Sequence, residues 1–125
     1  MAKRLLPLWL APLLLAGCAA HFVNLTPQPL ERNDNHLYPV EVAFKSRQQT
    51  LRWESIQPYV VVGTDFYPMR PTELMTDRWE TLVPVPAGTN LIHYKFKFDY
   101  LYNAMPQPQP GSAASPTYSL RILEK

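Results

Sequence analysis

Residues 92–100 read IHYKFKFDY, and this stretch decides the fold class. Apolar or aromatic residues occupy every second position, and charged or polar residues occupy the positions between them. Successive side chains of a β-strand point to opposite faces, so this pattern predicts a strand with one face in a core and the other in water. Aromatic residues also favour strands.

The same alternation recurs on both sides of this stretch. It is found in residues 38–45, 51–55, 79–85 and 118–122, and residues 59–62 form a short apolar run closed by Gly63. No window has the period of a long amphipathic helix. We therefore expect an all-β fold, an antiparallel β-sandwich of about seven strands, with Trp53 and Trp79 in its core.

The N-terminal residues predict export and lipidation. Lys3 and Arg4 precede an apolar stretch, residues 5–15, that is long enough for a signal peptide and too short to span a bilayer. The sequence LAGC at residues 15–18 then resembles the lipobox of bacterial lipoproteins. This resemblance implies that Cys18 becomes the first residue and carries a diacylglycerol on its sulfur, with further acyl chains such as palmitate. Several chains give an anchor that a single chain does not.

The lipobox also suggests how the chain is organised. We expect a signal peptide at 1–17, a lipidated N-terminus and tether at 18–36, and a β-sandwich domain at 37–125. Residues 19–36 contain Pro and Asn without sustained alternation, which is typical of a flexible segment with a span of roughly 25 Å. By the resemblance to lipoproteins, the absence of Asp after the Cys implies transport to the outer membrane, with the domain facing the periplasm.

Charge and motifs argue against several functions. The chain has 12 Lys and Arg against 10 Asp and Glu, and loss of the signal peptide makes these numbers equal, so nothing favours nucleic-acid binding. Cys18 is the only Cys, which predicts that there is no intrachain disulfide. The residues His21, His36 and His93 lack metal-ligand spacing, and no nucleophile elbow or phosphate loop occurs. We expect no enzymatic activity, no metal and no cofactor.

Two connections are longer than a hairpin needs, and long loops often carry function. They are residues 64–77 and 103–116. In the first loop, Phe66 and Tyr67 are candidate partner-binding residues, because aromatic side chains bury much area at low entropic cost. The alternative is that Phe66, Leu74 and Met75 cap the open end of the sandwich. The second loop, rich in Pro and Gln, is interpreted as a flexible loop or as a polyproline-like docking segment.

A family resemblance adds a further expectation. Gly63, Trp79, the turn PAG at 86–88 and the strand YKFKFD at 94–99 follow one another along the chain. Over residues 59–102 this order is similar to the early-set immunoglobulin-like modules that bind glycogen and related α-glucans. The resemblance implies an immunoglobulin-like fold, with Lys95 and Tyr102 contacting glycan. Residues 65–68 read DFYP where that family has Asn, Asn and Trp, which leaves Tyr67 as the third contact.

Two functions from different classes follow. The first is a structural or protein-binding adaptor, held at the membrane by lipid on Cys18, that binds another envelope protein. The second is a carbohydrate-binding module for an α-glucan or another envelope polysaccharide, with Tyr67, Lys95 and Tyr102 as its contacts.

Overall fold

The computed structural model describes residues 20–124, so the signal peptide expected at 1–17 and the lipidation expected at Cys18 lie outside the described residues. Within this range the chain has ten strands and no helix. The strands are β1 (Ala20–Asn24), β2 (Leu30–Glu31), β3 (Leu37–Ser46), β4 (Leu51–Val62), β5 (Asp65–Pro68), β6 (Arg70–Pro71), β7 (Arg78–Pro84), β8 (Leu91–Tyr102), β9 (Gln109–Ala114) and β10 (Tyr118–Leu123). No helix that could cross a bilayer is present in residues 20–124.

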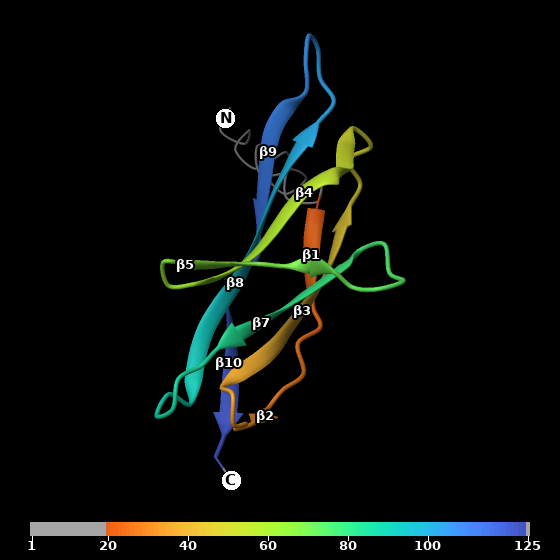
Figure 1. Cartoon of the computed structure of the whole chain (residues 1–125). Helices are drawn as coiled ribbons and strands as arrows, with labels where there is room; N and C mark the ends of the chain where they lie inside the picture. The colour runs from red at the N-terminus through yellow and green to blue at the C-terminus, as the bar shows by residue number, and fades with distance from the viewer. Residues whose placement is uncertain (1–19, 125) are drawn as a thin grey trace, which may run out of the picture.

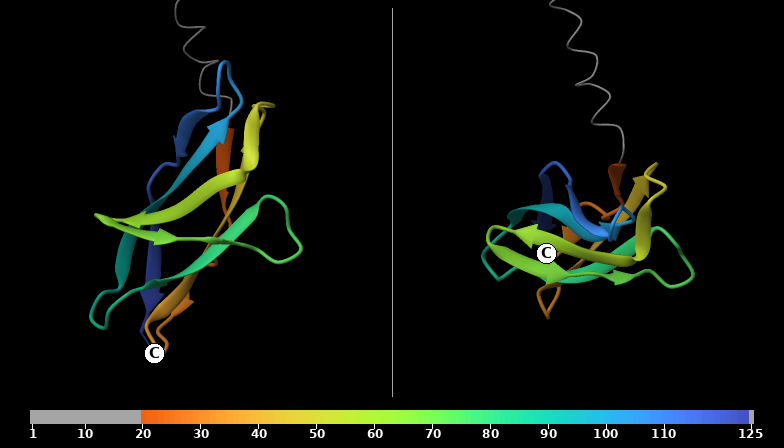
Figure 2. Two further views of the ribbon diagram at one scale, coloured as in Figure 1. Left: turned by 45° about the horizontal axis from the view of Figure 1, so that its top comes forward. Right: turned by 90° about the horizontal axis from the view of Figure 1, so that it is seen from above.

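The strands form two sheets that pack as a sandwich (Figure 1), and Figure 2 gives the arrangement from two further directions. The four-stranded sheet has the order β1-β3-β7-β6, and the six-stranded sheet has the order β2-β10-β8-β4-β5, with β9 also pairing with β8. All pairs are antiparallel except the short pair of β2 with β10. The expected all-β sandwich is confirmed, although it has ten strands rather than about seven.

The core lies between the two sheets and is built from the alternating positions that the sequence analysis singled out. In β8, Tyr94, Phe96 and Phe98 are at most 1% exposed, whereas Lys95 between them is exposed. The other strands contribute Tyr38, Val40, Val42 and Phe44 from β3, Val60 from β4, Trp79 and Val83 from β7, and Leu120 and Ile122 from β10. Aromatic rings therefore fill the centre of the sandwich.

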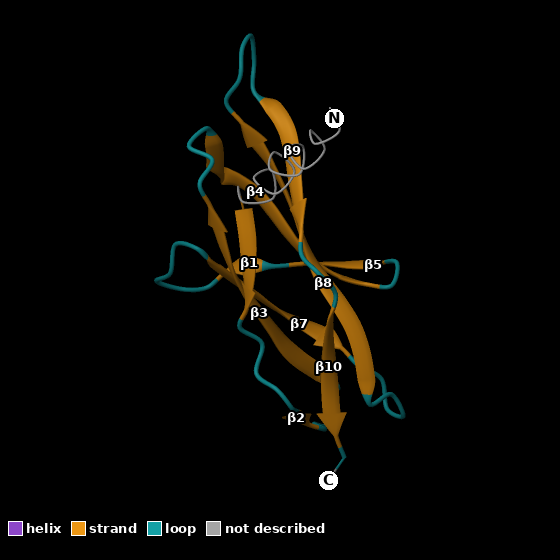
Figure 3. Ribbon diagram, turned by 180° about the vertical axis from the view of Figure 1, so that it is seen from behind, coloured by secondary structure: helices purple, strands orange, loops and turns teal. Residues whose placement is uncertain are grey.

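Two strands share one edge of β8 because the chain bends between them (Figure 3). Residues of β10 pair with the first part of β8, and residues of β9 pair with its last part. At the bend, the Ser115 backbone N–H donates to the Phe96 carbonyl (3.0 Å), and the Ser115 hydroxyl accepts from the Phe96 N–H (2.8 Å). Pro116 follows, so the serine maintains pairing where the proline changes the chain direction. The loop expected at 103–116 is thus only partly a loop, because β9 lies within it.

The N-terminal segment differs from the flexible tether expected at 18–36. Its described part begins with β1, which pairs with β3 over five residues and runs antiparallel to it. The Phe22 ring lies 5.0 Å from the Phe44 ring and 5.1 Å from the Phe98 ring, measured between centroids. Further along, the Leu25 N–H donates to the Glu41 carbonyl at 2.9 Å. This stretch is packed against the core, so the tether expectation is wrong for residues 20–36.

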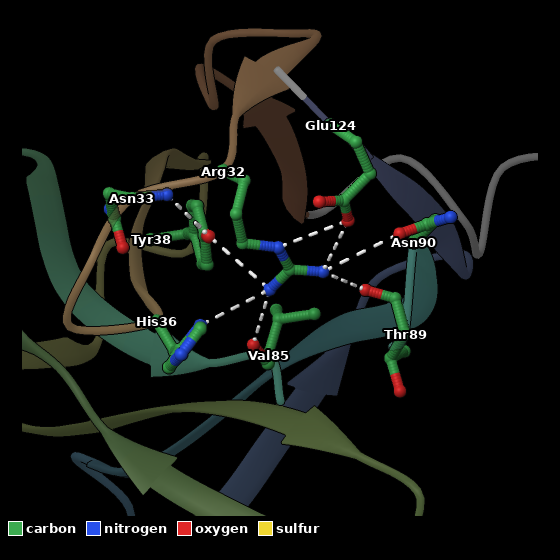
Figure 4. A network of polar contacts seen from close by, with 8 residues as sticks. All are labelled: Arg32, Asn33, His36, Tyr38, Val85, Thr89, Asn90 and Glu124. Carbon is green, nitrogen blue, oxygen red and sulfur yellow. Dashed lines mark hydrogen bonds and ion pairs between the residues drawn. The ribbon is translucent and has the colours of Figure 1, made fainter. Parts of the chain in front are cut away.

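Arg32 fixes the far end of the same segment (Figure 4). Its guanidinium donates hydrogen bonds to the carbonyl of Val85 (2.8 Å), to the carbonyl of Thr89 and to the carboxylate of Glu124 (3.1 Å). It also lies 5.9 Å from the centre of the Tyr38 ring. A planar group with five N–H donors can satisfy acceptors from three segments at once, which a lysine ammonium on its flexible stem cannot reproduce.

Candidate protein-binding surface

The candidate residues Phe66 and Tyr67 both lie on β5, at the edge of the six-stranded sheet, and they point to opposite faces. Phe66 pairs with Val61 of β4 and is 51% exposed on the outer face. Tyr67 pairs with Val60, whose side chain is fully buried, and packs against the core. Of the two aromatic residues, Phe66 is therefore the one available to a partner.

Phe66 lies on this outer face beside the apolar side chains of Tyr59 and Val61 and the charged side chain of Lys95. We call these four residues, Tyr59, Val61, Phe66 and Lys95, the outer patch. Val61 lies opposite Phe66 in β5 and opposite Lys95 in β8, so these three side chains form one row across three strands. The Tyr59 ring meets the Phe66 ring edge to face, with centroids 5.8 Å apart. Although Val61 lies on the outer face, it is only 6% exposed, because its neighbours cover it.

The charge at the margin of the outer patch comes from Lys95. Its neighbour on the same face, Lys97, forms an ion pair with Asp99 at 2.6 Å. Lys95 is exposed and has no ion pair within residues 20–124. The outer patch thus combines a half-exposed aromatic ring with one uncompensated positive charge.

Residues 64–77 do not cap the open end of the sandwich, which was the alternative interpretation of this segment. Leu74 is 100% exposed and Met75 is 46% exposed, so both side chains point away from the sandwich. The core is closed here by Met69, which is 7% exposed and lies between β5 and β6, where the chain crosses from one sheet to the other. The 14-residue loop was also an incorrect expectation, because it contains these two strands.

The three expected glycan contacts do not meet. Tyr67 faces the core, whereas Lys95 faces outward on β8. Tyr102 is seven residues further along β8, about 23 Å away, and an odd separation places it on the opposite face of the strand. Its ring lies against Gly111 of β9 instead. One sugar site built from these three residues is therefore wrong.

An open hollow of about 740 Å³, which no sequence pattern predicted, lies beside β4, β8 and β9. The pairing of β4 with β8 changes register between Arg52 and Gln57. At this irregularity, Ser55 Oγ donates to the Arg52 carbonyl (2.6 Å) and accepts from the Leu101 N–H (2.8 Å). The only sequence signal of this irregularity is a break in the alternation after residue 55. Such a break by itself indicates a boundary between two strands.

A second hollow, of about 480 Å³, lies beside Trp53. Trp79 is buried as expected, but Trp53 is 41% exposed and stacks on Trp79, with ring planes within 8° of parallel. At the rim, the Lys45 ammonium donates to the Asp77 carboxylate. This hydrogen bond, more than the charge of Lys45, holds the pKa of Asp77 below its ordinary value.

Within residues 20–124, no group of three or more His, Cys, Asp or Glu side chains is arranged to hold a metal ion. Comparison with known proteins finds no family model that matches this chain and no curated protein with significant sequence similarity.

Proposed function

We propose that this protein is a lipoprotein of the bacterial cell envelope that acts as a structural or protein-binding adaptor at the membrane. The LAGC sequence at 15–18 supports lipidation of Cys18 and, with the residues after it, a place at the outer membrane facing the periplasm. The observation that carries the binding role is the outer patch, where a half-exposed Phe66 lies on an edge strand.

The outer patch fits a protein partner for two reasons. Edge strands present backbone groups that another chain can pair with, and an aromatic side chain beside such an edge supplies specificity. Covering the exposed half of Phe66 removes about 100 Å² of apolar surface, which contributes ~2.5 kcal/mol to binding. The charge on Lys95 favours a partner segment that carries an acidic side chain next to an apolar one.

Site-specific photo-crosslinking in cells tests this role. A benzoylphenylalanine at position 66 is expected to capture one defined envelope protein. The matched control is position 82, because Leu82 is 54% exposed on the other sheet. In a binding assay with that partner, Phe66→Ala should raise Kd by roughly 60-fold, while Leu82→Ala should leave it unchanged.

Two results would reject the proposal. Equal crosslinking from positions 66 and 82, or none from either, removes the outer patch as a binding surface. Palmitate labelling that persists in the Cys18→Ser chain removes the anchor. The glycan-binding alternative is not proposed, because its expected contacts are separated in the fold.

A further inference from the structure

Two neighbouring loops form one end of the sandwich, and β1 starts in the same half of the molecule, set back from the ends of these loops, as Figures 1 and 3 show. We call the two loops, residues 47–50 and 103–108, the tip. The Asn103 N–H donates to the Thr50 carbonyl at 2.8 Å and joins them. The first residue of β1, Ala20, pairs with Ser46, which immediately precedes the first of these loops. The start of β1 therefore lies beside the first of these loops, in the half of the sandwich that carries both.

The position of Cys18 in the sequence determines which end of the domain is near the membrane. Cys18 precedes Ala20 by two residues, and an extended chain advances at most about 3.6 Å per residue. The Cys18 backbone thus lies within about 7 Å of the start of β1. Because β1 is paired with β3 from its first residue, a lipid on this residue would hold the half of the domain that carries the tip toward the membrane. The tip extends beyond the start of β1, so it would face the headgroups (Figure 1).

The chemistry of the tip suits a lipid surface. Met105 is 92% exposed between β8 and β9 and is followed by Pro106. A flexible thioether side chain of this kind can enter the boundary between headgroups and acyl chains. The tip contains Arg47 and no Asp or Glu. The nearest carboxylates along β4 and β8 are Glu54 and Asp99, and each is already paired, with Arg52 and with Lys97.

The opposite end of the sandwich carries exposed carboxylates instead. Glu31 and Asp34 are exposed there, near the turn at 86–90, whereas the exposed Glu124 is paired with Arg32. The length of β8, 12 residues, separates the two ends by about 36 Å. Anionic headgroups would attract the tip and repel this acidic end.

We propose that the tip docks on the surface of an anionic bilayer, with Met105 inserted below the headgroups. This inference rests on the proposed lipidation of Cys18. It assigns an orientation to the domain, with its strands rising from the membrane, and it replaces a free tether by direct contact between the protein and the lipid.

Depth-dependent quenching tests the docking. The full chain, processed and lipidated in cells, is purified as Met105→Cys, labelled with an environment-sensitive dye and placed in phosphatidylethanolamine–phosphatidylglycerol vesicles. The acylated Cys18 is not free to react, so the new thiol alone takes the dye. The control is Ala87→Cys, which places the dye on the exposed turn at the opposite end.

Brominated acyl chains should quench most of the fluorescence at position 105 and none at position 87. Equal quenching at both positions, or none at 105 in chains that carry palmitate, would overturn the docking while the proposed lipoprotein stands. Chains without palmitate would instead reject the anchor, and the docking with it. The Arg47→Glu variant should reduce the quenching at 105 in these anionic vesicles, and unchanged quenching would remove the role of charge.

Discussion

The packing of β1 leads to a prediction that distinguishes a strand from a tether. Replacing Phe22 by Ala removes a ring that lies between Phe44 of β3 and the Phe96 and Phe98 rings of β8. If residues 20–24 were a flexible tether, this change would leave the stability of the domain unaltered. Because Phe22 joins the two sheets, we expect a large loss.

The size of the loss follows from the contacts. Truncation of a fully buried Phe to Ala costs about 3–5 kcal/mol, and each aromatic pair adds about 0.5–1.5 kcal/mol to the burial term. Phe22 is only partly buried, so the lower end applies, at ~3 kcal/mol. For a domain of this size that corresponds to a fall in Tm of roughly 12–20 °C.

Urea and thermal unfolding of a soluble chain beginning at Ala19 measure the effect. The control is Val23→Ala on the same strand, because Val23 is 40% exposed and its truncation should cost less than about 1 kcal/mol. If both variants lost the same small amount of free energy of unfolding, β1 would be dispensable for stability. The start of β1 could then no longer be used to place Cys18 close to the folded domain.

Two further changes probe the turns and the ion pairs. Gly63 has φ +62° and open space where a side chain would project. Gly63→Ala should therefore lower the free energy of unfolding by ~1 kcal/mol through backbone strain alone, and Gly63→Asn should lower it by less. Urea midpoints measure both changes. The pKa of Asp77 is lowered in the folded state by the hydrogen bond from Lys45, so its stabilisation is present above the ordinary value of 3.8 and is lost as pH falls through the lower folded value. Asp77→Asn should therefore flatten the decline in stability in that acid range, and an unchanged slope would contradict the assignment.

The strands at the centre of the sandwich could be predicted because their alternation is long and aromatic. Residues 92–100 of β8 and 38–45 of β3 each have one buried face, as their sequences indicate, although the second face of β3 is itself half-buried and includes the buried Ala43. The sequence pattern divides β4 in two, because the register change between Arg52 and Gln57 breaks the alternation within one continuous strand. A local pattern cannot show a strand that continues through such an irregularity.

The N-terminal segment could not be predicted for a different reason. β1 has only five residues, and nothing in them indicates the partners that make it stable, which are Phe44 and Phe98 much later in the chain. Arg32 shows the same limit, since two of its acceptors are the backbone carbonyls of Val85 and Thr89 in remote segments. Backbone acceptors have no sequence signature.

The candidate surface was predicted in part. An exposed aromatic residue in 64–77 was expected, and Phe66 is that residue. Its neighbours Tyr59 and Val61 were not identified, because the register between β4 and β5 follows from the folded chain. The separation of Lys95 from Tyr102 could have been predicted, since seven positions along a regular strand reverse the face.

The docked tip and the outer patch together constrain where a partner can bind. Lys95 of the patch lies about 23 Å along β8 from Tyr102, which borders the tip. With the tip on the bilayer, the patch is therefore held at about this height, and it faces sideways because it lies on the outer face of a sheet whose strands rise from the membrane. A flexible tether of 18 residues would instead let the patch sample heights over roughly 25 Å. A fixed height favours a partner anchored in the same membrane, whose binding segment needs to reach only one domain length from the headgroups.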